Sequence, residues 1–119
     1  MPTIRNFKEL KVWQEAKELA IFCYNSLGTL KDYSFKDQLC RAVVSISNNI
    51  AEGFDRQNNK EFKHFLLISK GSCAEVQSMA YLALELAYIS KDQFNQIIEK
   101  AEIISKMLSK LIGHLKLHC

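Results

Sequence analysis

A stripe of polar side chains between residues 41 and 52 is the first candidate for chemistry. Arg41, Ser45, Asn49 and Glu52 recur at steps of three or four, which places them on one side of a helix beside an apolar stripe. In an antiparallel neighbour, Ser72 and Glu75 are expected at the same level. We interpret these six residues as a structural polar network, in which Arg41 pairs with Glu75 near the core. The alternative is that Arg41 and Asn49 contact a ligand, but one arginine among several glutamates makes a poor phosphate site.

Histidines and acidic residues raise the question of a metal site. A di-iron carboxylate bundle needs two Glu-x-x-His motifs, and only Glu61 and His64 have that spacing. His114 and His118 lie four residues apart with Cys119 adjacent, but no fourth ligand is evident. We therefore expect no metal and no other cofactor.

No pattern of a catalytic centre is found. The serines lack a Gly-x-Ser-x-Gly turn and a histidine partner, and the chain has no glycine-rich phosphate loop. We expect no catalytic residue, no small-molecule substrate and no enzymatic activity.

Four cations form the candidate nucleic-acid-binding surface, namely Arg56, Lys60, Lys63 and Lys70. They lie around the start of the third expected helix, and repetition in an assembly would multiply their field. Such a surface would contact RNA or DNA through the phosphate backbone. The alternative is an ordinary solvated helix face, because the whole chain has a net charge of only +3.

Hydrophobic periodicity predicts the elements that position these residues. The 119 residues contain one proline and four glycines, which favours long helices in a single domain, residues 1–119. Apolar residues at helical spacing predict helices over about 7–27, 35–52, 60–88 and 91–115. Expected N-terminal caps are Asn6, Ser34, Asn58 and Ser90, and Gly28 and Gly53 are expected to end helices with positive φ. The predicted fold is all-α, an antiparallel up-down-up-down four-helix bundle.

Three sequence blocks carry a resemblance to a known family. They are FKELKVWQEA (residues 7–16), QLCRAVVSISNNIAEG (38–53) and EFKHFLLISKGSCAE (61–75). In this order they resemble the 23S rRNA-intervening-sequence proteins, over about residues 7–112. The fold is also similar to that of the accessory variability determinant of diversity-generating retroelements.

The resemblance implies a cytoplasmic bacterial four-helix bundle that assembles with itself as a ring, with five copies expected. It implies no established activity, although the retroelement determinant works with nucleic acid. No segment has the roughly 18 consecutive apolar residues that a membrane span needs. Two functions remain open: an oligomer that binds RNA or DNA through its basic surface, and an oligomeric scaffold for proteins with no nucleic-acid role.

Overall fold

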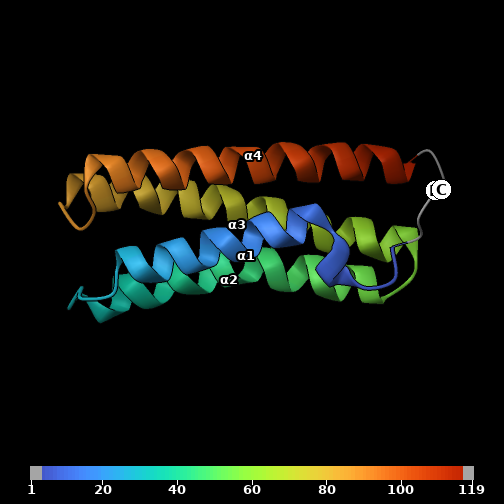
Figure 1. Cartoon of the computed structure of the whole chain (residues 1–119), viewed down its shortest axis with the longest axis horizontal. Coiled ribbons are helices and arrows are strands. Elements are labelled where there is room, and N and C mark those ends of the chain that lie inside the picture. Colours follow the sequence, from blue (N-terminus) through green and yellow to red (C-terminus); the bar gives the residue numbers. More distant parts are fainter. Residues whose placement is uncertain (1–3, 117–119) are drawn as a thin grey trace.

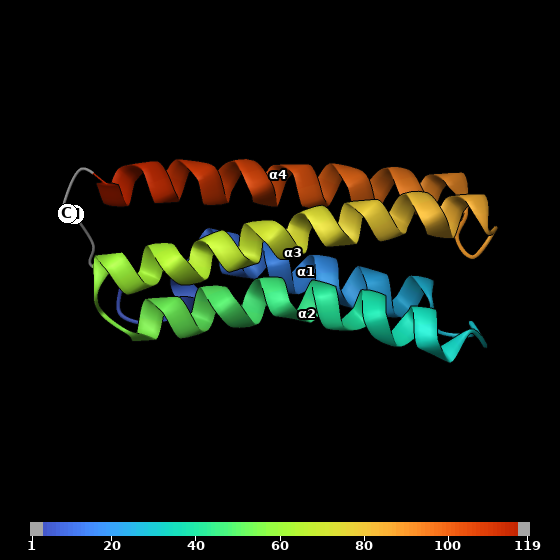
Figure 2. The same ribbon diagram turned by 180° about the vertical axis from the view of Figure 1, so that it is seen from behind.

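Four antiparallel α-helices make up the chain in a computed structural model, which describes residues 4–116 (Figure 1). A short 3-10 turn, η1 (Phe7–Glu9), precedes α1 (Lys11–Ser26), α2 (Tyr33–Asp55), α3 (Asn59–Glu85) and α4 (Lys91–Lys116). The described residues contain no strand. The predicted all-α four-helix bundle is confirmed, and each helix runs opposite to the one before it (Figure 2).

The first predicted helix differs from the structure at its start. Asn6 and Glu9 do form the predicted capping box, but they close only the turn η1. Leu10 then adopts an extended conformation (φ −74°, ψ 123°), so the α-helix begins at Lys11. The Leu10 amide donates to the Phe7 carbonyl at 3.0 Å, so η1 closes as a separate 3-10 turn, and Glu9 Oε2 accepts from the backbone amides of Arg5 and Asn6 at its start.

Two of the remaining predicted caps are confirmed, and one is wrong. The Asn58 side chain accepts from the Glu61 amide, and Ser90 and Gln93 bond reciprocally at the start of α4. The cap of α2 is Asp32, not Ser34, because Asp32 Oδ1 accepts from the Phe35 amide and α2 therefore begins earlier, at Tyr33.

The two glycines expected to end helices do not do so through positive φ. Gly53 lies inside α2, which continues to Asp55, and Gly28 has no positive φ. The left-handed positions after α2 and α3 are instead Gln57 (φ 55°) and Ala87 (φ 58°). Gly53 has a packing role, because a Cβ there would lie 2.7 Å from the Cβ of Phe65 on α3.

A continuous hydrophobic core runs along the bundle between the four helices. Each helix contributes side chains at the spacing that the sequence predicts. Fully buried examples are Leu19, Leu39, Val43, Ile46, Leu66, Val76, Ile97, Ile104 and Leu108. Within the described residues, no helix has the length and apolarity required to cross a lipid bilayer.

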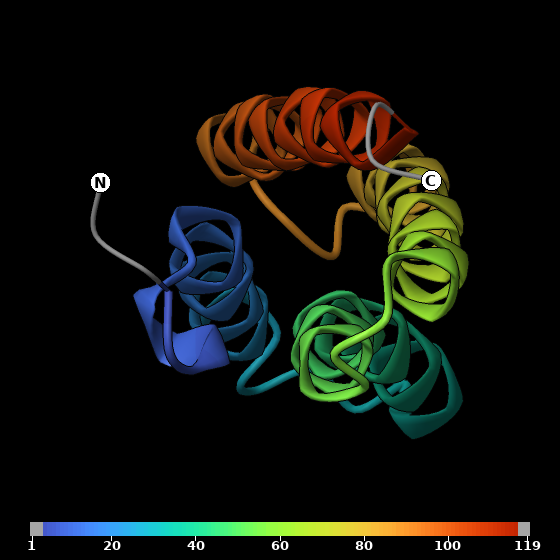
Figure 3. The same ribbon diagram turned by 90° about the vertical axis from the view of Figure 1, so that its right-hand side faces the viewer.

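The order of the helices around the bundle decides which surfaces lie together. Seen end-on, α1 packs on α2 and α4, and α3 also packs on α2 and α4 (Figure 3). The bundle measures 45 × 22 × 19 Å. The α2–α3 turn, the start of α1 and the end of α4 therefore lie together at one end of the long axis (Figure 1).

Candidate nucleic-acid interface

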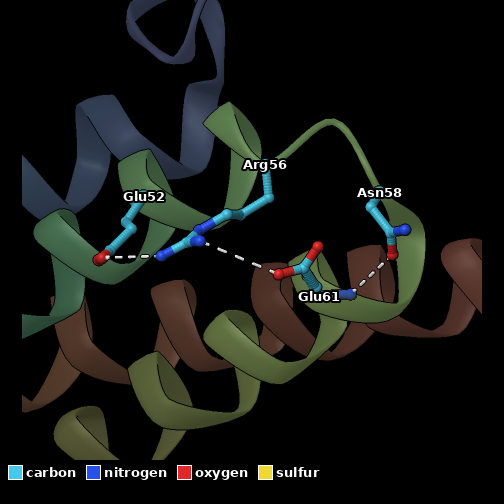
Figure 4. A network of polar contacts seen from close by, with 4 residues as sticks. All are labelled: Glu52, Arg56, Asn58 and Glu61. Atoms are coloured by element: carbon cyan, nitrogen blue, oxygen red, sulfur yellow. Dashed lines mark hydrogen bonds and ion pairs between the residues drawn. The ribbon is translucent and has the colours of Figure 1, made fainter.

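The α2–α3 turn holds the first of the candidate cations, Arg56. Its guanidinium lies 3.5 Å from Glu52 Oε1 and 4.0 Å from Glu61 Oε1 (Figure 4). It also lies over the Phe65 ring, 5.2 Å from the ring centroid. Arg56 is therefore engaged by two carboxylates and an aromatic ring, which leaves it less available to an external phosphate than its position in the sequence suggests.

An open hollow of about 560 Å³ lies beside this turn. It is lined by Arg56, Asn58, Lys60, Glu61, His64 and Phe65. Lys60 is exposed here, one turn from His64 on the same helix face. The hollow combines cations with an aromatic face, but Glu61 contributes an opposing charge.

The other two candidate lysines lie on a different flank of α3. Lys70 Nζ donates a 2.6 Å hydrogen bond to Ser109 Oγ on α4. Lys63 lies two helical turns before Lys70 and so shares this flank. The structure thus separates the predicted group into a pair at the turn, Arg56 and Lys60, and a pair beside α4, Lys63 and Lys70.

Cations that the sequence analysis missed come from α1 and α4. The three segments 4–15, 47–71 and 103–115 lie at the same end of the bundle, and we call them the basic half. They carry nine Lys and Arg against five Asp and Glu, a net charge of +4. Residues 16–46 and 72–102 form the other end, which we call the acidic half. They carry six Lys and Arg against eight Asp and Glu, a net charge of −2. The antiparallel topology alone would have identified Lys8, Lys11, Lys106 and Lys110 as further members of the basic half.

The predicted polar network exists only in part. Ser72 Oγ donates to Ser45 Oγ at 2.9 Å, and Asn49 Nδ2 donates to Ser45 Oγ at 3.0 Å. These three residues therefore link α2 to α3. The contact is small, local and polar, and it holds the two helices at one register.

The expected buried pair of Arg41 with Glu75 is wrong. The Arg41 side chain is 80% exposed and pairs with Asp37 on its own helix at 2.8 Å. Glu75 is also exposed, and Glu52 pairs with Arg56. Arg41 lies on the outer side of α2, because the spacing that defined the stripe also fits the solvent face of that helix.

The described part of the chain holds no group of three or more His, Cys, Asp or Glu side chains arranged to bind a metal ion. His118 and Cys119 lie outside the described residues. Burial raises the pKa of the Cys23 and Cys73 thiols to about 12, so neither is a thiolate at neutral pH. Burial also raises the pKa of Cys40.

Comparison with known proteins agrees with this architecture. A family model described as 23S rRNA-intervening sequence protein matches residues 8–110. A crystal structure of a protein with unknown function from the S23 ribosomal protein family of Bacteroides thetaiotaomicron is similar in fold, with a TM-score of 0.79 and 26% identity. The match covers 85% of this chain and 97% of that one. No curated protein matches the chain. Since the family model spans most of its length, the chain belongs to the 23S rRNA-intervening sequence protein family.

Proposed function

We propose that this protein is a non-enzymatic, self-associating four-helix bundle that binds RNA or DNA through phosphate contacts at its basic half. The observation that carries the proposal is the charge asymmetry along the long axis, +4 against −2. A phosphate backbone is attracted to concentrated positive charge and needs no built pocket. Neither the family nor the related protein of unknown function supplies an activity, so the proposal rests on charge and on the assembly that the family resemblance implies.

Self-association strengthens this proposal by repetition. One basic half with four excess charges attracts nucleic acid weakly, whereas several copies present the same surface several times. A cytoplasmic ring of five copies, expected from the family resemblance, would gather the basic halves on one rim.

The test is binding of mixed-sequence single-stranded RNA at a series of salt concentrations. Counterion release requires affinity to fall steeply as salt rises, with a slope of about 0.7 per phosphate contact. A variant with Lys60→Glu and Lys106→Glu, both exposed in the basic half, should weaken binding and reduce the slope by about 1.4.

A matched control reverses two exposed lysines of the acidic half, Lys31→Glu with Lys91→Glu. Both double variants have the same net charge, so only the position of the change differs. The proposal is overturned if the two variants weaken binding equally, or if the protein binds no RNA at any salt concentration.

The second candidate function is an oligomeric scaffold for other proteins with no nucleic-acid role. It is favoured by large apolar side chains that α3 exposes, among them Leu67 and Leu82. An assembly that fails to bind RNA at low salt would support this second function.

A further inference from the structure

The hollow beside the α2–α3 turn is nearly neutral, although it lies within the basic half. Two cations line it, Arg56 and Lys60. Two carboxylates lie against Arg56, those of Glu52 and Glu61. With these formal charges balanced, a phosphate gains little from entering the hollow. Its volume of about 560 Å³ lies within the roughly 300–1,000 Å³ of pockets that bind small organic groups, so an uncharged group fits it better.

Arg56 offers this hollow a flat surface rather than free hydrogen-bond donors. Its terminal nitrogens are directed at Glu52 and Glu61, at 3.5 and 4.0 Å (Figure 4). The guanidinium also lies over the Phe65 ring, 5.2 Å from the ring centroid. Because the Arg56 side chain lines the hollow and is 47% exposed, the face of the guanidinium opposite Phe65 remains accessible.

Two aromatic rings form the wall of the hollow next to this guanidinium. Phe65 is half-buried and His64 is exposed, and both line the hollow. Their rings meet edge to face, with centroids 5.6 Å apart. Aromatic rings and guanidinium planes are the side-chain surfaces on which unpaired nucleic-acid bases stack. The lining of the hollow therefore suits a base.

Polar donors flank these flat surfaces. Lys60 is exposed and forms no ion pair within residues 4–116. Its ammonium is therefore available to the phosphate beside a bound base. Asn58 Oδ1 accepts from the Glu61 amide at 3.1 Å, which leaves Asn58 Nδ2 to donate to a polar atom of the base (Figure 4).

We propose that this hollow binds one unpaired base of a single-stranded nucleic acid, stacked on Arg56 and His64, with the adjoining phosphate on Lys60. The proposal rests on the RNA or DNA binding proposed above and names the form of nucleic acid, a single strand. A duplex cannot fill the hollow without unstacking one of its bases, which costs free energy. Stacking accepts every base, so no strong sequence preference is expected.

The position of the hollow suits an assembly of several copies. The α2–α3 turn lies at one end of the long axis (Figure 1). With the basic halves gathered on one rim, as proposed above, each copy presents one hollow on that rim. Separate bases of one flexible strand then occupy separate hollows, and the overall affinity rises through multivalency.

The test compares a mixed-sequence single strand with an abasic strand of the same length, which keeps the phosphates and lacks the bases. At equal salt, the protein should bind the complete strand at least about fivefold more tightly. Both strands should show the same salt dependence, since they carry the same number of phosphates. The pair is prepared with ribose and with deoxyribose, and a preference in either form supports the site and identifies the sugar that it accepts.

A double variant removes the flat surfaces without changing the charge. Arg56→Lys keeps a cation and loses the planar guanidinium, and His64→Ala removes the exposed ring. At pH 8, where histidine is neutral, this variant should bind the complete strand no more tightly than the abasic strand, with an unchanged salt dependence. The matched control is Arg41→Lys, the same change at an ion-paired, exposed arginine of the acidic half, which should keep the preference.

The outcomes separate this site from the function on which it rests. Equal binding of the two strands by the unaltered protein would overturn the stacking site and leave the phosphate contacts in place. A preference that the double variant retains, or that Arg41→Lys also loses, would overturn the stacking site too. Failure to bind either strand at low salt would overturn both proposals.

Discussion

The Ser69 hydroxyl donates a 2.9 Å hydrogen bond to the main-chain carbonyl of Ile46, and both residues are fully buried where α2 meets α3. The carbonyl belongs to a helix, so it also accepts the amide four residues later. Ser69 thus buries a polar side chain without leaving it unsatisfied. This bond fixes the level of α3 against α2 in the middle of the bundle.

Replacement of this serine tests the strength of the bond. Ser69→Ala should lower the free energy of unfolding by about 1 kcal/mol, because Ile46 keeps its helical partner and only the cross-helix bond is lost. Ser69→Val should lower it further, by roughly 1–3 kcal/mol, since the extra methyl groups must fit a closed space. Urea unfolding monitored by circular dichroism measures both. A valine variant as stable as the alanine variant would contradict tight packing here.

The second prediction concerns Gly53, where α2 packs closely against the start of α3. A Cβ there would lie 2.7 Å from Phe65 Cβ and 3.0 Å from Phe62 Cδ1, so Gly53→Ala forces a backbone or ring shift. We expect a loss of roughly 1–3 kcal/mol in unfolding free energy, despite the better helix propensity of alanine. The matched control is Gly71→Ala, which should gain up to about 1 kcal/mol in dilute protein because its Cβ meets nothing. The same sign at both glycines would refute the packing explanation.

Ala87 ends α3 in the left-handed conformation, with φ 58°. The Tyr88 amide bonds back to the Ala83 carbonyl at 2.8 Å, which is the hydrogen bond of a Schellman motif. Ala87→Gly should raise the unfolding free energy by about 1 kcal/mol, because glycine adopts this conformation without steric strain. Ala20→Gly, the same change inside α1, should lower it by about 1 kcal/mol or more. Thermal unfolding of the two variants is the measurement, and a fall in stability for Ala87→Gly would contradict the prediction.

Helical periodicity and capping residues were enough to predict the fold. Leu39, Val43 and Ile46 repeat at helical spacing, and Asn58 and Ser90 cap the helices that they were expected to cap. These features depend only on residues a few positions apart, so they can be recognised from the sequence alone. The role of Gly53 was predicted wrongly, because a sequence does not distinguish a glycine that ends a helix from a glycine that lets a neighbouring helix pack closely.

The candidate site could be predicted less well, because a long charged side chain can reach several partners and the sequence does not show which of them it contacts. Arg56 has Glu52 four residues before it and Glu61 across the turn, and it contacts both. Lys70 reaches Ser109, 39 residues away in the sequence. The basic half becomes visible only when the antiparallel topology brings segments of α1, α3 and α4 to one end.

Replacement of Arg41 tests whether this side chain forms an exposed ion pair with Asp37 or a buried pair with Glu75. As an exposed ion pair within one helix, its bond to Asp37 should contribute at most about 0.5 kcal/mol. Arg41→Ala should therefore leave the unfolding free energy nearly unchanged, and high salt should remove the remaining difference. A loss of several kcal/mol would instead point to the buried pair with Glu75 that the sequence suggested.

The last prediction concerns pH and the bond between Tyr88 and Asp32, which joins the α1–α2 and α3–α4 connectors. The Tyr88 hydroxyl donates to Asp32 Oδ2 at 2.7 Å. This hydrogen bond lowers the pKa of Asp32 below its ordinary 3.8, helped by the Phe35 amide, and it raises the pKa of Tyr88 above 10.0. The Asp32 contribution to stability is present above its unfolded pKa and is lost as pH falls through the lowered value. The Tyr88 contribution is present below its unfolded pKa and is lost as pH rises through the raised value.

Tyr88→Phe keeps the ring contact with Phe35 and removes only the hydroxyl. We expect the variant to be less stable than the parent between about pH 5 and 9, and the difference to shrink below about pH 4 and above about pH 10. Urea unfolding across this range measures it, with Tyr33→Phe, whose side chain is 71% exposed, as the control that should show no such profile. A Tyr88→Phe difference that stays constant from about pH 3 to pH 11 would mean that the bond is absent in solution, because only the ionisation of these two groups gives the difference its pH dependence.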